Sequence, residues 1–245
     1  MSESLHRGAD KDEEFQETWR GLRLRLLARG LMPQPADSVS LRDPASGRMW
    51  WGTAADASMQ AVSIRSGASE LSMLAATAAS AATPATSAAS PLATIAAIAL
   101  HRTVYEARKD VCAVLIGGGA FCRQMGAFGG WMPSVFDEQI RQLGHMARPT
   151  EDLSQLPAAL ADGGNVALHA GQVLLLGMTP SRLALNAELF EKCAKAWVPA
   201  TAAGAKLRTL PWIVRHVANG RLMKEEARAR EQVRRGLRPE ETRGY

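Results

Sequence analysis

Three consecutive glycines, Gly117, Gly118 and Gly119, follow an apolar run typical of a β-strand and precede a segment with helical patterning. Glycines at such a junction can bring backbone N–H groups close to a phosphate or another anion. No Lys-Ser/Thr pair follows, as a Walker A loop requires, and the spacing differs from that of a dinucleotide-binding loop. The alternative is that the glycines serve close packing. Both interpretations stay open, and we favour packing.

His169 and Arg123 are the side chains best placed for chemistry in this sequence. His169 ends an apolar strand and can transfer a proton, whereas Arg123 lies just beyond the glycines and can stabilise a developing negative charge. No second acid/base group can be placed beside His169, so a buried, hydrogen-bonded histidine is equally consistent with its position. His101, inside a predicted helix, is assigned to the core. Trp131, in a glycine-containing loop, can stack on a planar ligand, although packing is the usual role of a tryptophan.

Apolar patterning predicts a mixed α/β protein that would position these residues. An amphipathic helix is expected over residues 13–30, with Gly30 as its stop. Strands are expected at residues 39–42, 49–51, 61–64 and 111–116, and a strand-turn-strand within 165–177. Further helices are expected at 92–108, 121–127 and 184–197, after residue 137, and along the charged C-terminus.

Residues 66–100 are almost entirely Ala, Ser, Thr, Leu and Pro. A membrane span needs about 20 strongly apolar residues, and the serines, threonines and prolines dilute this segment too far. We expect a helix near 70–80, a loop, and a second helix beginning near Leu92, with Ser90 as its N-cap. A flexible linker over 78–92 is the alternative.

Six segments resemble those of the class II aldolase/adducin family, in the same order along the chain. They are SVSLRDP (38–44), GRMWW (47–51), the run HRTVYEARKDVCAVLIGGG (101–119), MPSVFDEQIRQLG (132–144), NVALHAGQVLLLG (165–177) and ALNAELFEKCAKAW (184–197). The resemblance covers most of residues 20–200. It implies a three-layer α/β/α fold with a central, mainly antiparallel sheet flanked by helices. Family members hold a divalent metal ion with a His-x-His pair and a third histidine, and use a glutamate as acid/base.

The resemblance places none of these functional groups in this chain. The two His-x-His positions fall on Ile116 and Gly118, the third histidine position on Gly171, and the acid/base position on Ala97. His169, two residues before Gly171, would share its strand face and is the one displaced ligand available. A catalytic zinc site needs about three protein ligands. We therefore expect no metal and no cofactor, and an ion such as zinc only if the positions are shifted.

The family's phosphate-binding Gly-Asn pair is also replaced, by Asp37 and Ser38. A carboxylate there would repel a phosphate. The pocket implied by the resemblance is then formed by six residues: Ile116, Gly117, Gly118, Gly119, Trp131 and Gly171.

Charge and cysteine content restrict the function classes further. The net charge is +5 and the sequence pI is about 9.4. The excess arginines share their helices with acidic residues, without interleaved aromatics, so we do not expect nucleic-acid binding. Three widely spaced cysteines in apolar runs indicate reduced core thiols, and the charged N-terminus lacks the apolar region of a signal peptide. Both features predict a cytoplasmic protein without a membrane segment.

Three regions are predicted: a disordered tail at 1–12, a class II aldolase/adducin-like domain at 13–210, and a charged helix and tail at 211–245. The favoured function is a non-catalytic, regulatory or scaffold subunit in an oligomer. The resemblance implies a tetramer, either of this chain alone or with an active paralogue. Trp212 and Val217 on the last helix would then contact a neighbouring subunit.

The alternative function is a divergent lyase, either an aldolase or a decarboxylase of hydroxyaromatic or hydroxy acids, with a rebuilt pocket. Such an enzyme must stabilise an enolate or carbanion, and without a metal it needs oriented donors. The candidates are His169, Arg123 and the backbone amides of Gly117, Gly118 and Gly119.

Overall fold

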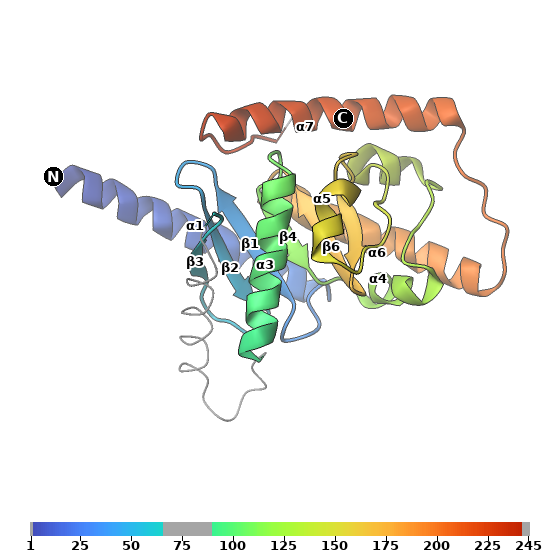
Figure 1. Ribbon diagram of the computed structural model, residues 1–245, viewed down its shortest axis with the longest axis horizontal. Helices are drawn as coiled ribbons and strands as arrows, with labels where there is room; N and C mark the ends of the chain where they lie inside the picture. The colour runs from blue at the N-terminus through green and yellow to red at the C-terminus, as the bar shows by residue number, and fades with distance from the viewer. Residues whose placement is uncertain (1, 66–89, 242–245) are drawn as a thin grey trace.

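A six-stranded sheet forms the centre of the protein in a computed structural model, which describes residues 2–65 and 90–241 (Figure 1). The strand order is β3-β2-β1-β4-β6-β5, and every neighbouring pair is antiparallel. The strands are β1 (Ser38–Asp43), β2 (Arg48–Thr53), β3 (Gln60–Ser63), β4 (Ala113–Ile116), β5 (Val166–His169) and β6 (Gln172–Gly177). The antiparallel sheet confirms the predicted topology.

The described helices are α1 (Ser2–Ala28), α3 (Pro91–Ala107), α4 (Ala120–Gln124), α5 (Leu156–Ala159), α6 (Pro180–Ala202) and α7 (Trp212–Arg234). Three shorter turns complete them: the 3-10 helices η1 (Met125–Phe128) and η3 (Leu153–Gln155), and the π-helical turn η2 (Gln139–Leu143). None of the helices within these described residues combines the length and the apolarity that a bilayer crossing needs.

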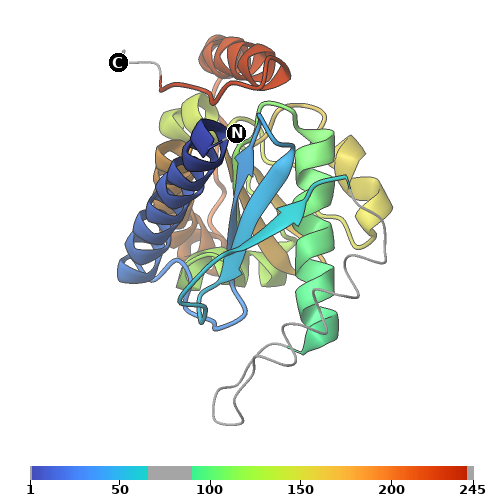
Figure 2. The same cartoon turned by 90° about the vertical axis from the view of Figure 1, so that its left-hand side faces the viewer.

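Helices cover both faces of the sheet, as the α/β/α prediction requires (Figure 2). Alternate strand residues point to opposite faces, so Leu115 packs with α1, α4 and α6, whereas its neighbour Val114 packs with α3 and α5. The first face receives the apolar stripe of α1, including Trp19, whose indole N–H donates to the carbonyl of Val39 at 3.1 Å. Two buried clusters, one on each face, therefore hold the three layers together.

Helix α3 begins where the sequence predicts. The Ser90 hydroxyl accepts the N–H of Ala93 at 3.3 Å, and Pro91 occupies the first turn. At the other end, the Arg42 guanidinium of β1 donates to the carbonyls of Arg108 and Val111, at 3.3 and 3.2 Å, and to that of Tyr105. These bonds engage carbonyls in the last turn of α3 and in the segment after it, and they fix the end of α3 against β1.

Helix α7 runs along one side of the molecule, at the top of the view in Figure 1. Its middle packs through Leu222 and Ala229 with Met178, which follows β6. Its first turns carry the exposed side chains of Trp212, Ile213 and Val217. The charged C-terminal helix predicted from the sequence is thus present, with one part buried and one part exposed.

Two local expectations are corrected. The tail predicted at 1–12 is helical from Ser2 onward, because hydrophobic periodicity begins only near Phe15 and so misses a helix formed by polar residues with adequate helix propensity. The helix predicted at 121–127 is α-helical only to Gln124 and tightens into η1, which ends at Gly129 with φ 83°. The helix expected near 70–80 and the loop after it lie outside the described residues.

Candidate functional site

A cavity of about 650 Å³ lies between the first half of α3, the sheet and the β5–β6 turn. One wall comes from α3, where Ala93, Ala96 and Ala97 follow helical spacing and line the cavity together. Their methyl groups leave room that larger side chains would fill, and none of them can transfer a proton. Ala97 is the residue that the family resemblance places at the acid/base position.

The sheet supplies the opposite wall through Trp51, Thr53 and Ile116. Ile116 ends β4, paired with Ser38 on one side and Leu174 on the other. Its side chain lines the cavity, where the resemblance places the first metal-binding histidine. A hydrocarbon group occupies that position.

Gly118, at the second metal position, does not line the cavity. Its N–H donates to the carbonyl of Leu31 at 2.9 Å, and a Cβ built there would lie 2.9 Å from Cβ of Cys122. The packing around Cys122 leaves no space for a larger side chain at this position. The structure therefore separates Ile116 from Gly118.

His169 does line the cavity, near its mouth, and is 9% exposed. Its Nδ1 lies 3.0 Å from the hydroxyl of Thr150, which fixes the ring. Asp152 lines the same mouth. The Ser154 N–H bonds to the Asp152 carboxylate and lowers its pKa, with a smaller contribution from His169, so this carboxylate is ionised at neutral pH.

Gly171 occupies the two-residue turn between β5 and β6 and is not among the lining residues. Ala170 and Gly171 have φ values of 46° and 73°, as a type I′ hairpin requires. The expectation that Gly171 shares a strand face with His169 is wrong, because the alternation ends at His169, which pairs with Gln172. Neighbouring Ala170 and Gln172 line the cavity instead.

Glu191 of α6 explains the glycine cluster. Its carboxylate accepts the N–H groups of Phe121 and Cys122, at 3.0 and 2.9 Å, at the start of α4. A Cβ on Gly119 would lie 2.3 Å from the carboxyl carbon of Glu191. Two amide donors that directly follow the glycines thus bind an internal carboxylate, and glycine is needed at position 119 for packing.

Arg123 and Trp131 are also engaged away from the cavity. The Arg123 guanidinium donates to both carboxylate oxygens of Asp37 at 2.5 Å and to the carbonyl of Gly118 at 2.9 Å. Burial raises the pKa of Asp37, and its bonds to Arg123 oppose that rise. The Trp131 indole donates to the carbonyl of Met146 at 3.0 Å, and Arg148 covers its ring. Neither Arg123 nor Trp131 is among the cavity's lining residues.

His101 is a core residue, as the sequence indicates. Its two ring nitrogens lie 2.9 and 2.8 Å from the hydroxyls of Ser38 and Ser40, and Tyr105 extends the network from the same helix. Complete burial lowers the pKa of His101 to about 3, so the ring is neutral. This histidine ties α3 to β1.

The cavity does not fit the divalent metal that the family resemblance implies. Of the residues at the four corresponding positions, Ile116 and Ala97 present hydrocarbon and the two glycines present no side chain. His169 is the single imidazole at the cavity, and within the described part of the chain no three His, Cys, Asp or Glu residues lie close enough to hold one ion. A catalytic zinc needs about three such ligands.

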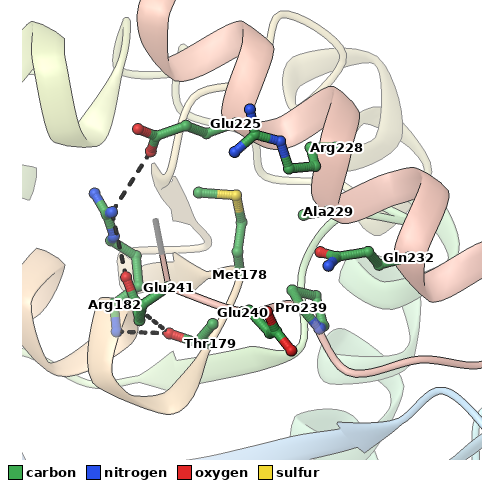
Figure 3. A pocket seen from close by; sticks show the side chains of 10 residues that line it. All are labelled: Met178, Thr179, Arg182, Glu225, Arg228, Ala229, Gln232, Pro239, Glu240 and Glu241. Carbon is green, nitrogen blue, oxygen red and sulfur yellow. Dashed lines mark hydrogen bonds and ion pairs between the residues drawn. The ribbon is translucent and has the colours of Figure 1, made fainter. Parts of the chain in front are cut away.

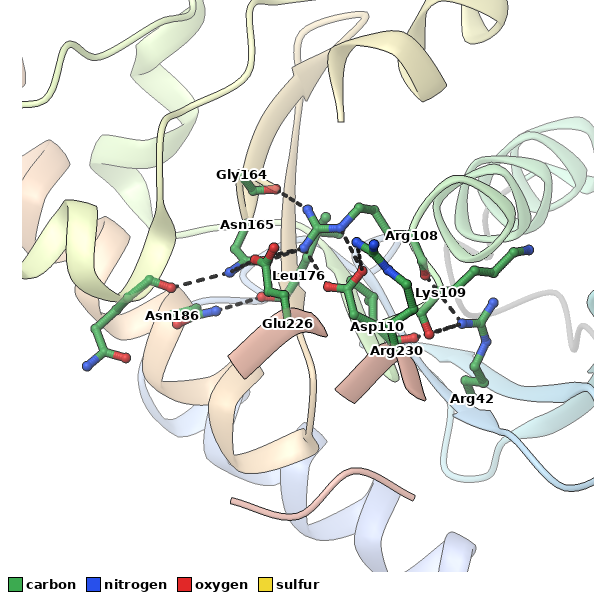
Figure 4. Close-up of polar contacts among 12 residues, drawn as sticks. Arg42, Arg108, Lys109, Asp110, Gly164, Asn165, Leu176, Asn186, Glu226 and Arg230 are labelled. Atoms are coloured by element: carbon green, nitrogen blue, oxygen red, sulfur yellow. Dashed lines mark hydrogen bonds and ion pairs between the residues drawn. The ribbon is translucent and has the colours of Figure 1, made fainter. Parts of the chain in front are cut away.

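A buried charge network lies at the opposite end of α3 and was missed by sequence analysis (Figure 4). Arg108 bonds to Asp110 at 2.6 Å and to Glu226 of α7 at 2.9 Å. The same guanidinium donates to the carbonyl of Gly164 at 2.8 Å and to Asn165 at 3.1 Å. The sequence predicts a solvent-exposed helix of mixed charge for this region. In such a pattern Glu226 cannot be distinguished from its exposed neighbours.

Glu226 is completely buried, and one of its carboxylate oxygens has no hydrogen-bond partner. Burial raises its pKa from 4.5 to about 7, against the opposing effect of Arg108. This network is buried, so it fixes α7 to the segments after α3 and before β5 and presents no open site.

A second hollow beneath α7, of about 10 Å³, is too small for a ligand larger than water (Figure 3). Arg182 of α6 fills its side by pairing with Glu225 at 3.5 Å and with Glu241 at 3.3 Å. These ion pairs join α6, α7 and the C-terminal segment. The larger cavity beside α3 is therefore the candidate functional site.

Solved structures similar to this one share the class II aldolase fold. YgbL from Klebsiella pneumoniae aligns with a TM-score of 0.63 at 15% identity, over 84% of this chain and 98% of that chain. L-fuculose 1-phosphate aldolase from Glaciozyma antarctica aligns with a TM-score of 0.60 at 13% identity, over 90% and 88%. An aldolase II superfamily protein from Pseudomonas syringae aligns with a TM-score of 0.56 at 16% identity, over 91% and 95%.

No protein-family model and no curated protein sequence matches the chain. The structural likeness is thus established through geometry rather than sequence. The chain has the class II aldolase fold, which confirms the fold predicted from its six ordered segments.

Proposed function

We propose that this protein is a metal-free member of the class II aldolase fold that acts without catalysis, as a regulatory or scaffold subunit of an oligomer. The observation that carries the proposal is the chemistry of the cavity wall. Ala97 and Ile116 line the cavity at two positions where the resemblance implies an acid/base and a metal ligand. Fold alone does not carry activity, and side chains of this kind supply neither proton transfer nor a Lewis acid.

The lyase alternative loses most of its candidate groups. Arg123 is bound to Asp37, and the amides of Gly117 and Gly118 donate to the carbonyls of Val173 and Leu31. His169 remains at the cavity, and the other ionisable side chains lining it are the exposed mouth carboxylates Glu151 and Asp152. Carbanion chemistry needs donors aimed at the developing charge.

An oligomer is part of the proposal, and the start of α7 is the surface that supports it. Trp212, Ile213 and Val217 are 67%, 66% and 69% exposed. We expect Trp212→Glu together with Val217→Glu to lower the mass measured by light scattering. Leu237→Glu, at another exposed apolar residue, is the matched control and leaves the mass unchanged. An unchanged mass in the double variant would remove this surface from the interface.

The proposal places the protein in the cytoplasm, supported by its three free, buried cysteines.

The proposed absence of catalysis is tested by assaying carbon–carbon bond cleavage. L-fuculose 1-phosphate and a set of hydroxyaromatic acids are incubated with the full chain, with and without added zinc. We expect no turnover above the protein-free rate in either condition. Turnover that Ala97→Phe abolishes, while Ala227→Phe on the exposed face of α7 retains it, would establish a lyase and overturn the proposal.

A further inference from the structure

We infer that the cavity beside α3 binds a small molecule with an apolar body and an end that is either a cationic amine or a neutral polar group, and that it excludes phosphates and carboxylates. The inference rests on the proposed absence of a metal, because a bound cation would reverse the charge of the site. It specifies the ligand class that a non-catalytic subunit of this kind would recognise.

The charges around the cavity all have one sign. Glu151 and Asp152 are the acidic residues that line it, beside the imidazole of His169, and both acidic residues are exposed at the mouth. No Lys or Arg is among the described lining residues. An anion entering the cavity would meet repulsion and no compensating cation.

Two arginines on elements that adjoin the cavity are used elsewhere. Arg102 of α3 donates to the carbonyl of Ile64 at 3.1 Å, and Arg123 is bound to Asp37. A buried phosphate or carboxylate requires paired charge or several hydrogen-bond donors, since an isolated buried charge is very unfavourable. The cavity provides neither, which argues against the anionic ligands named for L-fuculose 1-phosphate aldolases.

The walls suit an apolar ligand body. Ala93, Ala96 and Leu100 contribute aliphatic surface from α3, and Ile116 and Trp51 contribute it from the sheet. The volume of about 650 Å³ lies within the range of roughly 300–1,000 Å³ usual for small-molecule sites.

The test compares probes that share a phenyl group on a short chain and differ in the charge of the group at its end. Four are titrated into the full chain and followed by saturation-transfer NMR and calorimetry: 2-phenylethylamine, 2-phenylethanol, phenylacetate and 2-phenylethyl phosphate. We expect the amine and the alcohol to bind, the carboxylate to bind at least tenfold more weakly than the amine, and the phosphate not to bind.

Two variants assign the effect to this cavity. Glu151→Gln with Asp152→Asn removes both mouth charges, while the amide oxygen introduced at position 152 can still accept the Ser154 N–H. It should reduce the amine-to-carboxylate preference about threefold to tenfold, the size expected for two exposed charges, and leave the alcohol unchanged. Ala97→Phe should abolish binding of all probes by filling the cavity, whereas Ala227→Phe on α7 should not. Thermal melts of each variant establish that it folds.

Each outcome separates the inference from the proposed function. All titrations are repeated in EDTA and with added zinc. Phosphate or carboxylate binding that requires zinc would overturn the proposed metal-free function. Anion binding equal to that of the amine in EDTA, or no binding of any probe at 10 mM (about 100-fold above a Kd of 0.1 mM), would overturn the ligand class alone.

Discussion

Replacing Glu226 with glutamine should change how the stability of the fold depends on pH. Glu226 is completely buried beside Arg108, with Asp110 on the same guanidinium at 2.6 Å. Two buried carboxylates thus share one buried cation, with Arg230 only at 3.9 Å from Asp110 and exposed. Desolvation raises the pKa of Glu226 from 4.5 to about 7. A neutral side chain at position 226 balances the charges of the network.

The magnitude follows from that pKa difference. Because the folded pKa lies above the unfolded value, Glu226 contributes stability that is fully present below pH 4.5 and is lost as the pH rises through 7. At about 1.4 kcal/mol per pKa unit, the loss is about 3 kcal/mol. Glu226→Gln lacks this titration. We therefore compare how much the free energy of unfolding decreases between pH 4.5 and pH 8 in the two proteins. The decrease should be about 3 kcal/mol smaller in Glu226→Gln than in the wild type.

The assay is urea unfolding followed by far-UV circular dichroism at half-unit pH steps. Glu225→Gln is the matched control, since Glu225 adjoins Glu226 but pairs with Arg182 at a partly exposed site. The control should keep the slope of the wild-type profile. A Glu226→Gln profile parallel to the wild type at every pH would refute the assignment of this titration to Glu226. A destabilisation of Glu226→Gln that appears only above about pH 7, where Glu226 is ionised, would instead indicate that Arg108 depends on the charge of Glu226.

Three further outcomes test the local packing and the cavity. Gly119→Ala places a methyl group 2.3 Å from the Glu191 carboxyl carbon and should lower the free energy of unfolding by about 2 kcal/mol or more, whereas Gly126→Ala meets nothing within 4 Å and should change it by less than about 0.5 kcal/mol. If the two substitutions have equal effects in urea unfolding, the packing account of the glycine cluster is wrong. Ser90→Ala removes the N-cap of α3 and should cost about 1 kcal/mol, measured in the same way; no change would mean that the cap is not formed in solution. Ala97→Phe should leave the secondary structure intact and abolish probe binding, and retained binding would place the ligand elsewhere.

The sheet and its flanking helices are predictable from local patterns. Short β-branched and leucine runs such as residues 113–116 and 173–176 mark buried strands. Ser90 and the proline after it mark the start of α3, because side-chain capping and proline geometry act within a single turn. These signals depend on neighbouring residues, and the order of the segments supplied the topology through resemblance.

The candidate site is less predictable because its contacts join distant residues. Glu191 caps α4 from about 70 residues away, and nothing near Gly119 indicates that a carboxylate from α6 fills the expected anion position. Counting along the chain put Gly171 on the face of His169, but the turn ends the strand alternation between them. The burial of Glu226 depends on how α7 packs against Arg108 and Asn165, which the composition of that helix does not specify.

The mouth of the cavity was also only partly predictable from the sequence. His169 was recognised as facing the site, whereas Glu151 and Asp152 were not, since they reach it through a loop before η3. Their charge decides which ligands the cavity admits. Exposed carboxylates in a loop have no sequence signal that separates them from ordinary surface residues.

Metal content per chain is the most direct test of the central claim. Protein purified without an affinity tag for metal and without chelator is analysed by inductively coupled plasma mass spectrometry. We expect less than about a tenth of an equivalent of any divalent transition metal, because a structured three-ligand site normally keeps its ion through purification. A near-stoichiometric ion that is lost on replacing His169 with glutamine would contradict the account and place a rebuilt metal site at the cavity.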